Sequence, residues 1–145
     1  MEHTFKPMTQ NRNYEAALIA RAFICLSIII SGLALRVFGF HLGLPAFVVK
    51  YGGSMLWGAM VFFLVAMAAS DRSRRSLALI SALIAIGVEL FRLVHAPWLD
   101  AFRLTIAGAL LLGRVFSPWN MLAYGVGIVL AMWLDRYAVP ARRAH

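Results

Sequence analysis

The chain has 145 residues, of which 62% are hydrophobic and 14% are charged, and its formal net charge is +8. A soluble domain carries about 25% charged residues, so this composition excludes an ordinary soluble protein and predicts a single transmembrane domain over residues 1–145. The basic excess does not predict nucleic-acid binding, because arginine and lysine stand at the ends of apolar blocks and form no basic stripe.

Apolar segments that are long enough to cross a bilayer, which takes about 20 residues, follow one another along the chain. We place them at about 16–38, 47–69, 76–96 and 119–139. Between the third and the fourth, the apolar core of 105–115 is shorter, which is typical of a re-entrant or interfacial segment. The sequence therefore predicts an all-α, integral membrane helical bundle with four transmembrane helices and one short re-entrant or interfacial helix. Whether 105–116 spans the membrane instead is left open.

The distribution of basic residues predicts the orientation. Of the 14 arginines and lysines, nine fall on one side of four such spans and five on the other. The side that is richer in arginine and lysine faces the cytoplasm in most membrane proteins. We therefore expect cytoplasmic tails at about 1–15 and 140–145, with both termini cytoplasmic.

Ionisable residues accumulate where the third apolar segment ends. The stretch VELFRLVHAPWLDAFR, residues 88–103, contains Glu89, Arg92, His95, Asp100 and Arg103. At 100° per residue, Glu89 and Arg92 share a helix face with small residues, whereas leucine and isoleucine occupy the neighbouring face. Small residues let membrane helices approach closely, so we expect Glu89 and Arg92 to point into the bundle.

The second and fourth segments carry polar residues on one face near their starts. Because spans alternate in direction, these residues and the end of the third segment are expected at one depth, towards the outer side. We predict an outer-facing polar pocket formed by Lys50, Ser54, Glu89, Arg92, Asp100, Arg103, Asn120 and Tyr124. The alternative is an ion-pair network that sets helix register. Either would offset the cost of an ionised Glu89, about 2.5–3.5 kcal/mol at the bilayer centre.

The residue types predict neither a metal site nor a bound cofactor. His95 has no second ligand at metal-binding spacing, and Cys25 is the only cysteine. Neither Ser54 nor Ser117 stands in a nucleophile motif. We assign no catalytic residue, although Glu89 as the general base of a lipid-modifying enzyme is left open.

From Lys50 the chain reads KYGGSMLW, and from Val88 it reads VELFRLVHAPWLDAFRLTIAGALLLGRVFSPWNMLAYGVG. This order resembles a family of small bacterial membrane proteins, the domain of unknown function 2809, and more distantly the VanZ-like proteins. The resemblance implies a multi-pass protein of the bacterial inner membrane. It also implies an acid, glutamine, histidine and aspartate where this chain has Ser54, Arg92, Ala109 and Asn120.

For the function, we predict that the polar pocket binds membrane lipid. The ligand would be an anionic headgroup or a lipid-linked envelope intermediate, because the planar guanidinium of arginine binds phosphate through two hydrogen bonds. One alternative is a small proton-coupled transporter or channel that uses Glu89. Another is a structural subunit that binds a protein partner or forms a homo-oligomer. The sequence names neither the substrate nor the oligomeric state.

Overall fold

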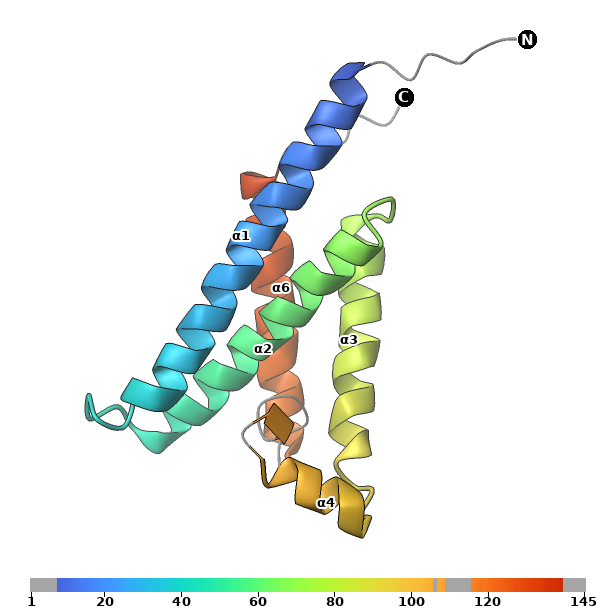
Figure 1. Cartoon of the computed structure of the whole chain (residues 1–145). Helices are drawn as coiled ribbons and strands as arrows, with labels where there is room; N and C mark the ends of the chain where they lie inside the picture. The colour runs from blue at the N-terminus through green and yellow to red at the C-terminus, as the bar shows by residue number, and fades with distance from the viewer. Residues whose placement is uncertain (1–7, 106, 109–115, 140–145) are drawn as a thin grey trace.

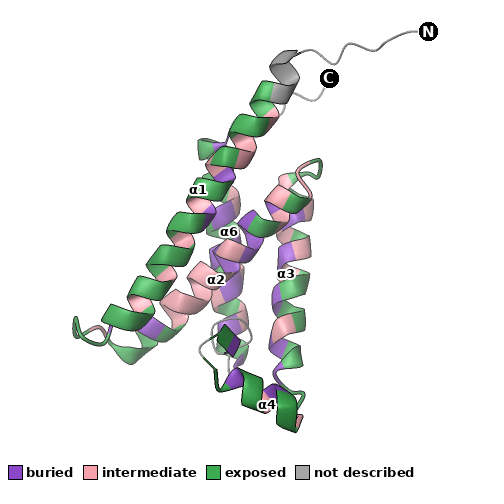
Figure 2. Ribbon diagram, viewed as in Figure 1, coloured by how far each residue is buried: buried purple, intermediate pink, exposed green. Residues whose placement is uncertain are grey.

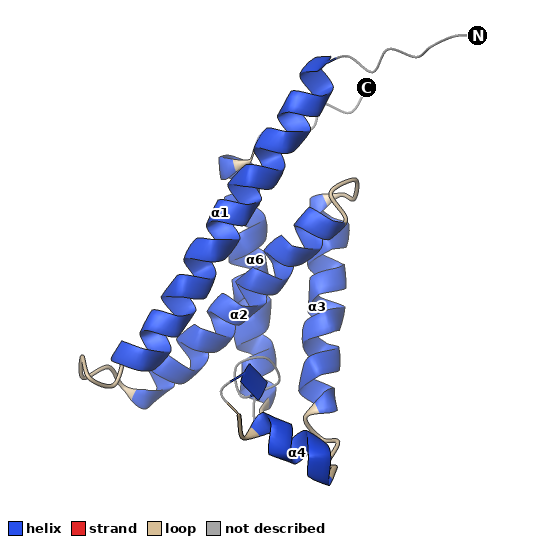
Figure 3. Ribbon diagram, in the orientation of Figure 1, coloured by secondary structure: helices blue, strands red, loops and turns tan. Residues whose placement is uncertain are grey.

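The computed structural model describes residues 8–105, 107–108 and 116–139, and the fold is all-α, as predicted. Its helices are α1 (Met8–Phe38), α2 (Ala46–Ala68), α3 (Arg74–Phe91), α4 (Pro97–Arg103) and α6 (Pro118–Ala138). α2 packs against α1, α3 and α6, and α3 also packs against α6 (Figure 1). The short α4 follows α3 at the end of the bundle where α6 begins (Figure 3).

The predicted boundaries hold to within one residue for α2 and α6, but not for the other long helices. α1 begins at Met8, so the helix extends into the predicted tail. α3 ends at Phe91, so the predicted end at Ala96 is wrong. Turns follow Phe91, and Pro97 then begins α4, where its missing N–H is not needed.

The connection between α3 and α6 contains a short helix, but at a different position from the predicted one. α4 covers Pro97–Arg103, immediately before the apolar core of 105–115. Residues 107–108 are also helical. The rest of that core, including Ala109, lies outside the described residues, so re-entry of 105–116 stays a prediction.

Two of the described helices are long and apolar enough to cross a bilayer. The qualifying segments are Arg12–Phe38 in α1 and Ala46–Ala68 in α2. α3 and α6 do not pass the same test of length and composition. α3 carries two arginines and Glu89, and α6 carries Asp135 and Arg136 near its end. Length and composition alone therefore identify α1 and α2, but not α3 and α6, as candidate spans.

The inward faces of α3 and α6 are those that the helical spacing predicts. α3 buries Ser81, Ala85 and Glu89 and exposes Leu79 and Leu83 (Figure 2). α6 likewise buries the predicted polar and small residues on one face, namely Asn120, Tyr124, Gly127 and Ala131. The 3.6-residue period thus correctly separates the packed face of each helix from the exposed one.

α2 and α6 approach each other closely at two glycines. A Cβ atom on Gly127 would collide with the backbone carbonyl of Met55, and a Cβ atom on Gly58 would collide with the backbone of Tyr124. Close backbone approach at small residues is typical of helix pairs in membranes. This approach brings the first half of α6 against α2.

We expect Gly127→Ala to lower the free energy of unfolding by about 1–3 kcal/mol, since the added methyl group must displace backbone. Gly125→Ala is the matched control, because a Cβ atom there meets nothing within 4 Å. Alanine at this position should be neutral or stabilising by up to about 1 kcal/mol. Denaturant titration in micelles measures both. Equal stability of the two variants would contradict the close approach of α2 and α6.

Candidate functional site

The carboxylate of Glu89 is fully buried, with an exposed fraction of 0%, and it accepts from four donors. Oε2 lies 2.6 Å from Nη1 of Arg92 and 3.0 Å from the hydroxyl of Tyr124. Oε1 accepts from the backbone N–H of Ser117 at 2.7 Å and from Nδ2 of Asn120 at 3.4 Å. Glu89 therefore connects the last turn of α3 to the start of α6, and its charge is compensated by Arg92.

A second layer of contacts adds α2. The hydroxyl of Ser54 donates to Oδ1 of Asn120 at 3.3 Å, and it also lies 3.1 Å from the carbonyl of Lys50. The rings of Trp57 and Tyr124 pack 4.9 Å apart between centroids. We call the polar residues joined in this way the Glu89 cluster: Ser54, Glu89, Arg92, Ser117, Asn120 and Tyr124.

Three of the residues predicted for the polar pocket lie beside this cluster. Nη1 of Arg103 lies 3.1 Å from Oδ1 of Asp100. Arg103 also donates to the carbonyls of Phe91 and Val94, at 2.7 and 2.8 Å, which holds α4 against the end of α3. Lys50 is exposed, with its ammonium 5.2 Å from the centroid of the Tyr51 ring.

The described contacts thus bring Ser54, Glu89, Arg92, Asn120 and Tyr124 together. Asp100 and Arg103 form a neighbouring pair, and Lys50 lies one turn before Ser54. Whether these groups line a hydrated pocket on the outer side stays a prediction. No three metal-binding side chains gather among the described residues.

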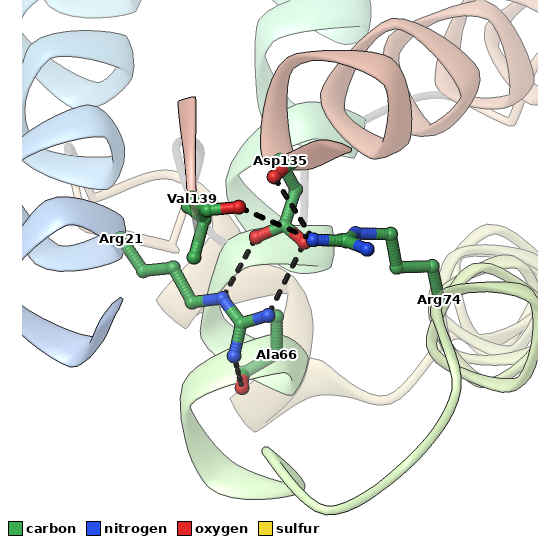
Figure 4. A network of polar contacts seen from close by, with 5 residues as sticks. All are labelled: Arg21, Ala66, Arg74, Asp135 and Val139. Carbon is green, nitrogen blue, oxygen red and sulfur yellow. Dashed lines mark hydrogen bonds and ion pairs between the residues drawn. The ribbon is translucent and has the colours of Figure 1, made fainter. Parts of the chain in front are cut away.

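A second buried carboxylate, which the sequence analysis missed, lies towards the opposite end of α2, α3 and α6. Figure 4 shows its polar contacts. Asp135, with an exposed fraction of 0%, accepts from Nε of Arg21 at 2.7 Å and from Nη2 at 3.2 Å. Nε of Arg74 lies 2.8 Å from the same carboxylate. Arg21 also donates to the carbonyl of Ala66 at 2.8 Å. We call these residues, with Val139, the Asp135 network.

The Asp135 network joins all four long helices. Arg21 lies on α1, Ala66 on α2, Arg74 on α3 and Asp135 on α6. Nη2 of Arg74 also approaches the carbonyls of Asp135 and Val139, at 3.3 and 3.4 Å, which holds the start of α3 against the end of α6. A signal was available in the sequence, because Arg21 is an ionisable residue within an apolar segment, as Glu89 is.

Both buried carboxylates are surrounded by donors, and neither reaches the surface. An ionised carboxylate only accepts hydrogen bonds. With four donors around Glu89 and two arginines around Asp135, each carboxylate acts as a fixed negative charge that holds the surrounding groups in place. The accessible edge of the Glu89 cluster is Ser54, which is half-buried, with Lys50 exposed beside it. The part of the cluster that is accessible from outside the bundle therefore lies on α2.

A comparison with known families places this cluster in context. The family model described as "Protein of unknown function (DUF2809)" matches residues 43–128. The match contains every residue of the Glu89 cluster, whereas Arg21 and Asp135 lie outside it. Ser54, Arg92 and Asn120, where the residue order departs from what the resemblance implies, all belong to the cluster. No solved structure matches the chain. The match covers more than half of the chain, and the chain therefore belongs to the DUF2809 family.

Proposed function

We propose that the protein is a multi-pass protein of the bacterial inner membrane, with α1, α2, α3 and α6 as spans and both termini cytoplasmic. The length and apolar character of α1 and α2 support this placement. The charges of α3 and α6 that would oppose insertion are largely buried and compensated. Large apolar side chains such as Phe23, Leu83 and Trp133 are exposed around the helices, as lipid-facing residues are.

We propose further that the end of the bundle around the Glu89 cluster binds an anionic lipid headgroup or a lipid-linked envelope intermediate. The proposal depends on one observation. The exposed ammonium group of Lys50 lies beside Ser54, the half-buried residue of an otherwise buried polar cluster. Lys50 is accessible, Ser54 lies one turn further into the helix, and Asn120 and Arg92 lie behind it. Lysine binds phosphate as a point charge, and hydroxyl and amide groups supply hydrogen bonds.

The charge balance of this end also favours an anion. Among the described residues, Arg36, Lys50, Arg92 and Arg103 are positive, and Glu89 and Asp100 are negative. Glu89 itself is too enclosed to contact a ligand. Its role in the proposal is to position Arg92, Asn120 and Tyr124 around the ligand-facing edge.

Replacing Lys50 by glutamine tests the proposal without disturbing the buried cluster. A basic residue near an anionic membrane surface contributes about 1 kcal/mol, so we expect binding of acidic lipid at this end to weaken about fivefold. Native mass spectrometry of the purified protein, titrated with phosphatidylglycerol, measures this change. Arg12→Gln is the control, because it removes an exposed charge at the other end. Unchanged binding in Lys50→Gln would contradict the proposal.

The alternatives from the sequence differ in their support. The role of a structural subunit is favoured by the contacts of Glu89 with Arg92, Ser117, Asn120 and Tyr124. These contacts fix the positions of α3 and α6 whether or not a ligand binds. Co-purification of a stoichiometric partner would distinguish this role from lipid binding. A proton-coupled transporter receives less support. Its carboxyl group must carry a proton, and of the four described partners of Glu89 the groups of Arg92, Ser117 and Asn120 can only donate, which leaves the hydroxyl of Tyr124 to accept.

A further inference from the structure

The end of the bundle that holds the Asp135 network also exposes arginine side chains. Arg72 and Arg75 flank the start of α3, and Arg136 lies in the last turn of α6. The contacts of Arg74 with Asp135 and Val139 hold these two helix ends together. All three exposed arginines are therefore within a few residues of Arg74 or Asp135 in the chain, and the contact between these two residues brings them to the same end of the bundle. We call them the inner arginine surface.

The charges at this end do not cancel. Asp135 is shared between Arg21 and Arg74, so the buried network keeps one positive charge in excess. Asp71, which is 77% exposed, lies 4.0 Å from Arg72. In the part of the chain that the structure describes, neither Arg75 nor Arg136 forms an ion pair with an acidic side chain. Two further positive charges thus remain at the surface.

The stability of α3 does not account for these arginines. Arg74 and Arg75 occupy the first turn, which contains no acidic residue. Acidic residues are favoured there, because the helix dipole is positive at this end, and basic residues oppose it. Asp135 compensates Arg74, whereas Arg75 and Arg136 have no acidic partner among the described residues and are available to an external anion.

Aromatic residues independently mark this end as the membrane interface. Trp133 and Tyr137 lie in the last two turns of α6 and are exposed. Tryptophan and tyrosine gather at the level of lipid headgroups. They therefore place the neighbouring Arg136, and with it the start of α3, at the depth where lipid phosphates lie.

We propose that the inner arginine surface binds acidic phospholipids of the cytoplasmic leaflet through their phosphate groups. Guanidinium groups pair with phosphate through two parallel hydrogen bonds, and basic clusters next to membrane spans attract anionic lipid. This inference rests on the proposed membrane placement, but not on a ligand at the Glu89 cluster. It assigns a second lipid contact at the opposite end of the bundle.

The test compares the wild type with the variant Arg72→Gln/Arg75→Gln/Arg136→Gln, purified in micelles that contain phosphatidylglycerol and phosphatidylcholine. Native mass spectrometry counts the lipids retained, and this readout does not depend on how the protein inserts into a membrane. We expect retention of phosphatidylglycerol at this surface to fall at least about tenfold, as three lost basic residues imply. Retention of phosphatidylcholine should not change. The helical circular dichroism signal shows that the variant is folded.

Two further arms identify the cause. The matched variant Arg72→Lys/Arg75→Lys/Arg136→Lys keeps the charge but loses the paired hydrogen bonds of guanidinium, so it should retain less phosphatidylglycerol than the wild type and more than the glutamine variant. Inorganic phosphate, at an ionic strength matched with chloride, should not displace the lipid. Wild-type retention in the glutamine variant, equal losses in both variants, or displacement by phosphate would each overturn the inference. Lys50→Gln tests the other end independently, so failure of one proposal is distinguishable from failure of the other.

Discussion

Glu89→Gln is expected to lower the free energy of unfolding by about 3–5 kcal/mol, the cost of breaking a buried ion pair from one side. Glutamine has nearly the same shape, so no cavity forms. Arg92 stays buried but loses its negative partner, 2.6 Å away. The new amide group also presents N–H donors to the guanidinium of Arg92 or to the backbone N–H of Ser117, neither of which can accept. Denaturant titration in micelles, followed by circular dichroism, measures the change.

The chain contains a matched control for this experiment. Asp100 and Arg103 form a second pair with the same three-residue spacing, but the side chain of Asp100 is 45% exposed. Arg103 is itself buried, but it also donates to the carbonyls of Phe91 and Val94, so Asp100→Asn should cost less, about 1–2 kcal/mol. A comparable loss in the two variants would mean that burial does not determine the contribution of Glu89. Adding Arg92→Gln to Glu89→Gln should recover part of the loss, because it removes the uncompensated charge.

Asp135→Asn is expected to be equally destabilising, by about 3–5 kcal/mol, because two arginines lose one buried partner. Arg21 is the more affected, since its side chain is buried, whereas that of Arg74 is partly exposed. Asp71→Asn is the control. The side chain of Asp71 is 77% exposed and lies as far as 4.0 Å from Arg72. Its loss should therefore change the free energy of unfolding by less than about 0.5 kcal/mol.

A local readout separates loosening of α1 from a general loss of stability. Cys25, the only cysteine, is buried one helical turn after Arg21. If Asp135 anchors α1, Asp135→Asn should speed the reaction of Cys25 with a maleimide, under conditions where the protein remains folded. Asp71→Asn should leave that rate at the wild-type value. An unchanged rate in Asp135→Asn would show that the packing of α1 on α2 is sufficient without the ion pair.

Local sequence patterns are sufficient to predict the all-α class, the limits of α2 and α6, and the packed faces of α3 and α6. These features follow from local patterns, because hydropathy sets helix limits and the 3.6-residue period sets the direction of each side chain. The pairing of Glu89 with Arg92 was also predictable, since residues three apart lie on one helix face.

Contacts between helices, in contrast, depend on how the helices pack and cannot be predicted from local patterns. The partners Arg21 and Asp135 are separated by 114 positions in the chain, and Glu89 accepts from the backbone of Ser117, which no side-chain pattern indicates. Arg103 likewise donates to the backbone carbonyls of Phe91 and Val94, contacts that no side-chain pattern indicates. A helical period fixes the direction in which a side chain points. Which partner that side chain contacts depends on how α2 and α6 cross and how far each is shifted along its axis. Packing at Gly58 and Gly127 sets both.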